Sequence, residues 1–321
     1  MQAFEDVDFC VGHKDNSTNQ IDLFNSLREQ MVMETSCSLL AGLSSFAAAV
    51  WDRKTGALIA TITFPQEKSS SWKYISFLNS SELACGGLMV IIWNFKTNTQ
   101  RTIRKLAVEY GIALTHRIIS PKTDILIISK KNTIEVWNTA TSKRLAQYEH
   151  ETKSESVFID CMIRVNKDLV ALNCQPDVIL YNYNTLQVHK VITKPELKKI
   201  SQMSSSNGRL YIHTPQRLYR VGVEDDSLTT IANSQGYCFS LEVLNENFFV
   251  ATKATGVYRI HYGKKTTIHE DAALLIGKVD NKLIMFQEQS NHVILFDPFT
   301  NEKLLELEGL PSMCVCPFTS Y

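Results

Sequence analysis

The sequence lacks the motifs of several large functional classes. It has no Walker or G-x-G-x-x-G loop, no Gly-x-Ser-x-Gly elbow, and eight scattered histidines without zinc-ligand spacing. Nucleotide binding, serine-hydrolase chemistry of that kind and a zinc site therefore have no motif to support them. We predict no catalytic, cofactor-binding or metal-binding residues.

An excess of positive charge is also missing. Lys and Arg number 33 and Asp and Glu number 33, for a formal net charge of +0. Nucleic-acid binders draw much of their affinity from neutralising phosphates, so we expect nucleic acid as a partner only indirectly, within a complex. No apolar run reaches the ~18 residues of a membrane span, which predicts no membrane partner.

The eight cysteines show no disulfide framework, and the opening MQAFEDVDF has neither a basic region nor an apolar one. A start of that kind is not a secretory signal peptide. Cys85, Cys161, Cys174 and Cys238 lie in or beside strand-like runs, where a free thiol behaves as a small buried hydrophobe. We therefore expect an intracellular, reducing location, cytoplasmic or nuclear, with all cysteines reduced.

One repeated pattern is present. An apolar run ends in an aromatic residue, Asp or Asn follows directly, and Thr comes three residues after that. The five copies are Trp51-Asp52-Thr55, Trp93-Asn94-Thr97, Trp137-Asn138-Thr141, Tyr181-Asn182-Thr185 and Phe296-Asp297-Thr300.

A hairpin turn explains the pattern. An Asx side chain can accept a hydrogen bond from the backbone two residues later, and the aromatic before it offers a large face for packing. The residue after Thr is Gly, Asn or Ser in four copies, where a positive φ is needed: Gly56, Asn98, Ser142 and Asn301. Each turn is followed by another strand-like run.

Two weaker copies place Val221 and Ile260 at the aromatic position, so the seven anchors are 36 to 44 residues apart. Strand-like runs before each anchor bring the count to four strands a unit, as in IALTHRII, DILIIS, TIEVWN and KRLAQY. Seven such units predict an all-β, seven-bladed β-propeller of four-stranded antiparallel blades, with every anchor on a third strand.

The aromatic–Asx ends and the spacing resemble the WD40-repeat family over residues 37–321. The resemblance implies a propeller that works through protein interactions. Trp51-Asp52 is the one literal Trp-Asp pair, and no unit has a clear Gly-His pair in its leading loop. The polar Asp–His–Ser/Thr–Trp network of many family members is therefore not assigned to residues here.

The two ends of the chain predict how the propeller closes. The unit begun at Cys37 lacks a leading strand, and PSMCVCPF near the C-terminus has no unit of its own. We favour Met313–Pro317 as the missing strand of the first blade; the rival is Asp6–His13. Residues 37–321 then form the propeller and residues 1–36 an N-terminal extension.

Within that extension, residues 14–35 predict a short amphipathic helix. Ser17 is a suitable cap, and Ile21, Phe24, Leu27 and Met31 recur at helical spacing. Two roles stay open for it: packing on the propeller itself, or binding a partner.

The predicted function is a non-catalytic protein–protein interaction platform, or a scaffold subunit of a larger intracellular assembly. The expected partners are one or more proteins bound to a propeller face or to the N-terminal helix. Aromatic and long polar residues dominate interface hot spots. On that basis the partner-binding candidates are Trp72, Tyr110, Lys130, Tyr237 and Gln289.

The alternative is a propeller-type enzyme, a hydrolase or lyase, with its site in the central channel. Such a site needs converging carboxylates, histidines or a metal. The expected inner strands offer only His116, Asp160 and Glu242, each in a different blade, which favours the interaction platform.

Overall fold

The structure is a computed structural model. It describes residues 39–43, 47–52, 55–64, 74–87, 89–104, 117–130, 132–151, 159–234, 236, 238, 240–253, 256–269, 273–279, 282–287, 292–307 and 314–317.

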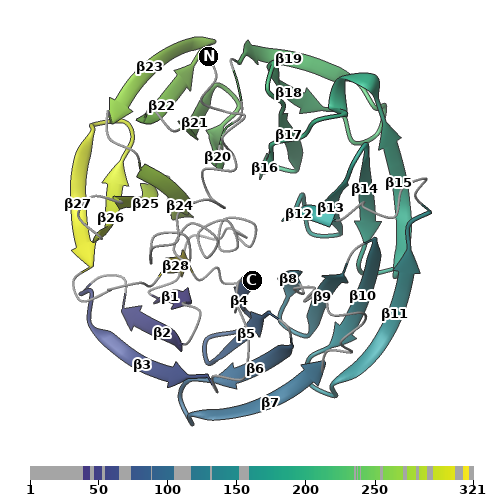
Figure 1. The fold of residues 1–321 in the computed structure, drawn as a ribbon, viewed down its shortest axis with the longest axis vertical. Helices are drawn as coiled ribbons and strands as arrows, with labels where there is room; N and C mark the ends of the chain where they lie inside the picture. The colour runs from purple at the N-terminus through teal and green to yellow at the C-terminus, as the bar shows by residue number, and fades with distance from the viewer. Residues whose placement is uncertain are drawn as a thin grey trace, which may run out of the picture. The chain divides into compact units, whose positions relative to one another are not determined.

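The strands form seven four-stranded antiparallel sheets, the blades of an all-β, seven-bladed β-propeller (Figure 1). They fall into two compact units, one with β1–β11 and β28 and the other with β12–β27. Each unit is described by itself.

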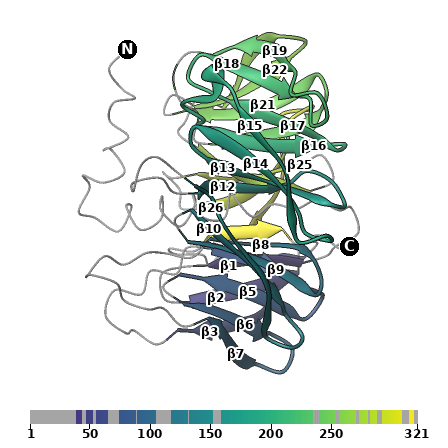
Figure 2. The same cartoon turned by 90° about the vertical axis from the view of Figure 1, so that its right-hand side faces the viewer.

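The first unit holds three blades, in the orders β28-β1-β2-β3, β4-β5-β6-β7 and β8-β9-β10-β11. In the second of these blades, β5, β6 and β7 follow one another in both views (Figures 1 and 2). The strands are β1 (Leu39–Leu43), β2 (Ala47–Asp52), β3 (Leu58–Thr63), β4 (Tyr74–Phe77), β5 (Glu82–Gly86), β6 (Val90–Asn94), β7 (Thr99–Arg104), β8 (Arg117–Lys122), β9 (Ile125–Lys130), β10 (Thr133–Asn138), β11 (Lys143–Glu149) and β28 (Cys314–Pro317).

The second unit holds four blades, each built from four consecutive strands. The strands are β12 (Ile159–Arg164), β13 (Leu169–Cys174), β14 (Asp177–Asn182), β15 (Gln187–Thr193), β16 (Gln202–Ser206), β17 (Arg209–His213), β18 (Arg217–Val221), β19 (Leu228–Asn233), β20 (Ser240–Asn245), β21 (Phe248–Lys253), β22 (Gly256–His261), β23 (Lys264–His269), β24 (Ala273–Val279), β25 (Lys282–Gln287), β26 (His292–Asp297) and β27 (Glu302–Leu307). A short 3-10 helix, η2 (Pro195–Leu197), joins two of these blades.

Burial changes across each blade. Second and third strands are buried along most of their length, as in β13 (Leu169–Cys174) and β14 (Asp177–Asn182). Fourth strands alternate between exposed and half-buried residues, as in β11 and β15. A strand that is buried on both faces of its sheet has a nearly continuous run of apolar residues in the sequence. An edge strand in contact with water does not. This is why the apolar runs before each anchor were clearer in the sequence than the strands after it.

The seven anchors all lie on third strands, which confirms the predicted register. A bulge falls directly before the anchor in four blades, at Trp51, Trp137, Tyr181 and Phe296. A bulge increases the local twist, and here it comes where the strand enters its turn. Burial raises the pKa of Tyr181 to about 12 because the phenolate would lose its hydration.

The Asx side chains of the turns accept backbone hydrogen bonds, as predicted, but the bond common to all five turns comes from three residues later and not two. The side-chain Oδ1 of Asp52, Asn94, Asn138, Asn182 and Asp297 accepts from the backbone N–H of the Thr three residues later, at 2.8–3.4 Å. The residue after Thr has a positive φ in all five turns. These residues are Gly56, Asn98, Ser142, Leu186 and Asn301. Leu186 is the one that the sequence did not predict, since leucine seldom takes this conformation.

Leu186 gives a test of backbone strain. We expect Leu186→Asn to raise the free energy of unfolding by roughly 0.5–1 kcal/mol, because asparagine adopts the left-handed region at a lower energetic cost than leucine. Leu145 is an exposed leucine on β11 (Lys143–Glu149) with no positive φ, so Leu145→Asn is the control. Chemical denaturation of both variants measures the free energy of unfolding. An equal change in that free energy for the two variants would contradict strain at Leu186.

The C-terminal strand completes the first blade. β28 (Cys314–Pro317) pairs antiparallel with β1 (Leu39–Leu43), with Leu40 opposite Pro317 and Leu43 opposite Cys314. This pairing is the one predicted for Met313–Pro317. The rival strand Asp6–His13 and the predicted helix over 14–35 both lie outside the described residues, so the division at residue 36 stays a prediction.

The four cysteines with described side chains are buried and form no disulfide with one another: Cys85, Cys161, Cys174 and Cys238. In the described part of the chain, no helix has the length and apolar character to cross a membrane.

Candidate functional site

An exposed group of rings lies on two neighbouring blades of the second unit. We call it the aromatic surface: Phe248, His261, Tyr262 and Phe299, with Arg259 beside them. Phe248 is buried, whereas Tyr262 is 74% exposed and Phe299 47% exposed. The Phe248 and Phe299 ring centroids are 4.5 Å apart, Phe248 and His261 are 5.2 Å apart, and His261 and Tyr262 are 4.5 Å apart. One buried ring therefore supports rings that face solvent.

Tyr262 occupies an unusual place in the backbone. It and Gly263 form the two-residue turn between β22 (Gly256–His261) and β23 (Lys264–His269), with φ values of 48° and 74°. Turns of this kind favour Asn-Gly, because both residues need a positive φ. The neighbouring turn at Asn207-Gly208 follows that rule. Tyr262 thus combines an unfavourable backbone conformation with an exposed ring, and strained residues of this kind cluster at functional sites.

Phe299 is positioned by the turn after the last anchor. Its backbone N–H donates to Asp297 Oδ1 at 2.9 Å. The Lys282 ammonium donates to the other carboxylate oxygen of Asp297, and this hydrogen bond is the main reason why the pKa of Asp297 lies below its usual range. The charged form of the carboxylate that holds the turn is therefore favoured.

Arg259 connects the two blades beneath the rings. Its Nη1 donates to the carbonyl oxygen of Pro298 at 3.2 Å, and its guanidinium carbon is 5.9 Å from the Phe248 ring centroid. That position is within the range of a cation–π contact. The turn carrying Tyr262 and the turn carrying Phe299 are thus held together by a side chain from β22.

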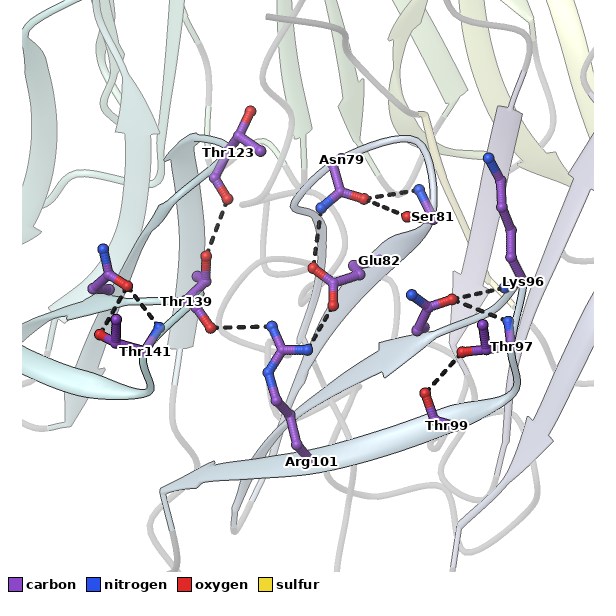
Figure 3. A network of polar contacts seen from close by, with 12 residues as sticks. Asn79, Ser81, Glu82, Lys96, Thr97, Thr99, Arg101, Thr123, Thr139 and Thr141 are labelled. Atoms are coloured by element: carbon purple, nitrogen blue, oxygen red, sulfur yellow. Dashed lines mark hydrogen bonds and ion pairs between the residues drawn. The ribbon is translucent and has the colours of Figure 1, made fainter.

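A second polar cluster lies in the first unit (Figure 3). Arg101 on β7 (Thr99–Arg104) binds Glu82 Oε1 through Nη1 at 2.5 Å and the carbonyl oxygen of Thr139 through Nη2 at 3.0 Å. Asn79 also donates to Glu82, at 3.0 Å. Arg101 therefore links its own blade to the turn of the next one, and both carboxylate oxygens of Glu82 are engaged. This arrangement fastens two blades together.

The residues considered for channel chemistry are only partly described. The Glu242 side chain on β20 (Ser240–Asn245) is buried, whereas His116 and the Asp160 side chain lie outside the described part. Among the side chains that the structure describes, no three His, Cys, Asp or Glu residues gather as metal ligands would.

Of the five predicted partner-binding residues, the structure describes Lys130 alone. It is the half-buried last residue of β9 (Ile125–Lys130) and pairs with Thr133. Trp72, Tyr110, Tyr237 and Gln289 lie outside the described residues, so that group stays a prediction.

Sequence reasoning missed the aromatic surface. A signal was present at Tyr262-Gly263, where an aromatic residue stands at the first position of a turn flanked by alternating strands. Phe299 lies inside the repeat pattern but at a position the pattern leaves open. The contact of both turns with Phe248 and Arg259 depends on how neighbouring blades pack, which the sequence pattern does not state.

The comparisons with known proteins identify the fold and leave the family open. The sequence matches no protein-family model and no curated protein. Among solved structures, 1234 chains match, so the architecture is too widely shared to discriminate between functions. One of them is BamB from Moraxella catarrhalis, with a TM-score of 0.56, 11% identity, and coverage of 77% of this chain and 78% of that one. At that identity the likeness shows the fold alone.

Proposed function

We propose that this protein is a non-catalytic protein–protein interaction platform, a scaffold subunit of an intracellular assembly in the cytoplasm or nucleus. We further propose that it is a member of the WD40-repeat group of propellers. The aromatic–Asx–Thr turns support membership: their hydrogen bonds recur in five blades.

The observation that carries the proposal is Tyr262. Its ring is 74% exposed and its backbone has a φ of 48°. The positive φ lowers the stability of the free protein and the exposed ring adds little to it, so the tyrosine is better explained by a contact made in a complex. Tyrosine and arginine are also enriched among the residues that carry binding energy. Tyr262, with Phe299 and Arg259 next to it, has the composition of such a contact.

The partner that fits this surface is a protein. Rings standing on a rigid turn lose little conformational entropy when another surface covers them. The buried Phe248 beneath Phe299 and the Arg259–Pro298 hydrogen bond hold the turns in place before binding. A scaffold of this kind needs no change of shape on association.

Replacing Tyr262 separates binding from stability. We expect Tyr262→Asn to raise the free energy of unfolding by roughly 0.5–1.5 kcal/mol, because asparagine suits the turn. The same change should raise the Kd of the main partner at least about tenfold, because a hot-spot ring is lost. The partner is first recovered by affinity purification from cells and then purified, and its Kd is measured by calorimetry.

The control is Leu304→Asn, on β27 (Glu302–Leu307). Leu304 is another exposed apolar residue in the second unit, 45% exposed, and it has no positive φ. Leu304→Asn should leave both the Kd of the partner and the free energy of unfolding unchanged. If Tyr262→Asn bound the partner with unaltered affinity, the aromatic surface would be ruled out as the binding site.

A further inference from the structure

A pocket of about 280 Å³ lies between two adjacent blades of the second unit. On one side is the end of β19 (Leu228–Asn233), and on the other is the hairpin of β22 (Gly256–His261) and β23 (Lys264–His269). Its lining residues are His213, Ala232, Asn233, Ser234, Ala251, Tyr258, Ile260, Gly263 and Lys265. The volume is at the lower end of the ~300–1,000 Å³ typical of ligand pockets, which limits an occupant to a small molecule.

One wall of the pocket carries a positive charge. The Lys265 ammonium is 3.7 Å from the centroid of the Tyr258 ring, which holds it against the wall by a cation–π contact. Among the residues that the structure describes, none forms an ion pair with Lys265. The Lys265 ammonium is therefore held in position and can attract an anionic group of a ligand.

The wall contributed by the other blade contains a histidine between two serines. The imidazole of His213 is 1% exposed; Ser201 Oγ is 2.6 Å from its Nδ1, and Ser234 Oγ is 2.7 Å from its Nε2. Each serine has one proton to donate. Ser201 has a second acceptor at 3.1 Å, the carbonyl oxygen of His213, whereas the second acceptor of Ser234, the carbonyl oxygen of Gly236, is 3.5 Å away.

Both ring nitrogens of His213 therefore lie within hydrogen-bond distance of a serine hydroxyl, and the imidazole holds Ser234 Oγ in place. In either tautomer of His213, Ser234 Oγ keeps a lone pair that can accept a hydrogen bond. Ser234 lines the pocket, so this side of it matches a hydrogen-bond donor on the ligand.

Apart from Asn233, the other side chains of the lining are largely apolar, with Ala232, Ala251, Ile260 and the ring of Tyr258. We propose that this pocket binds a small hydroxycarboxylate with an apolar body, its carboxylate at Lys265 and its hydroxyl donating to Ser234. The pocket shares the Tyr262-Gly263 turn with the aromatic surface but is lined by other side chains, and its proposed ligand goes beyond the proposed scaffold role.

Three related compounds test the contributions of the carboxylate and the hydroxyl of the proposed ligand. 4-Hydroxybenzoate carries both groups, 4-hydroxybenzamide lacks the charge, and benzoate lacks the hydroxyl. By ligand-observed NMR titration or calorimetry we expect 4-hydroxybenzoate to bind with a Kd of about 1 mM or below. The amide and benzoate should each bind at least about threefold more weakly, because each loses one polar contact.

Variants of the pocket assign these differences to residues. Lys265→Gln should abolish the preference for the acid over the amide. Lys264→Gln is the matched control and should retain it, since the neighbouring residue on a strand faces the other side of the sheet. Ser234→Ala should abolish the preference for the hydroxyl while retaining that for the acid. Absence of saturable binding up to about 10 mM, equal binding of acid and amide, or an effect of Lys264→Gln equal to that of Lys265→Gln would each overturn the proposal.

Discussion

Deleting residues 309–321 is expected to leave the protein insoluble, or unfolded at body temperature. The deletion removes β28, whose backbone pairs with β1 over four residues, from Leu40 opposite Pro317 to Leu43 opposite Cys314. An unpaired strand edge invites aggregation. β1 carries the buried Leu40 and Ala41, and exposing an apolar side chain of leucine size costs about 1.5–3 kcal/mol against the ~5–15 kcal/mol of a typical domain.

The matched control is removal of residues 1–13, which takes away none of the described strands. We expect this shorter chain to stay soluble with an unchanged Tm. The soluble fraction on expression and the Tm by calorimetry give the answer. Should the C-terminal deletion behave like the full chain while the N-terminal one aggregates, closure through Asp6–His13 would be correct instead.

The second large effect is expected at Trp93, the anchor of β6 (Val90–Asn94). Its side chain is 0% exposed, its ring centroid is 6.1 Å from that of Phe95, and its Nε1 donates to Asn98 Oδ1 at 3.1 Å. Trp93→Ala should lower the free energy of unfolding by about 3–5 kcal/mol, because a cavity replaces a fully buried ring and Asn98 loses a donor.

Trp137 provides the comparison for that variant. It is the anchor of β10 (Thr133–Asn138) in the adjacent blade and is only half-buried, with Nε1 donating to Glu135 at 3.0 Å. We expect Trp137→Ala to cost roughly half as much, since less apolar surface leaves water on folding there. Equal losses in chemical denaturation would show that the anchors act through their turns rather than through burial.

Much of the fold could be predicted because a propeller repeats a local pattern. An aromatic–Asx–Thr turn needs only residues adjacent in the chain, so five copies were visible without knowledge of their neighbours. Val221 and Ile260 were placed from spacing, and the structure has both on third strands. Leu186 marks the limit of this reasoning: its positive φ is imposed by the hairpin around it and not by its own preference.

The candidate sites were much less predictable. Tyr262 and Phe299 are 37 residues apart in the sequence, and they belong together only because their turns share Phe248 and Arg259. The pocket likewise joins His213 to Ser201, Ser234 and Lys265, which come from two blades. None of these residues stands in a motif, since the distances that relate them are set by the packing of one sheet on the next.

The sequence by itself determined the blade: its four strands, its turn chemistry and the seven repeats, while it left two candidates for the strand that completes the first sheet. These features follow from hydrogen bonds between near neighbours and from the alternation of apolar residues. Both depend on residues that are close together in the sequence. The tertiary structure alone decided which turns meet, which ring is left in solvent, and where two blades leave a pocket lined by a lysine from one blade and a serine from the other. Such features depend on distances between residues far apart in the sequence, and a local pattern carries no information about them.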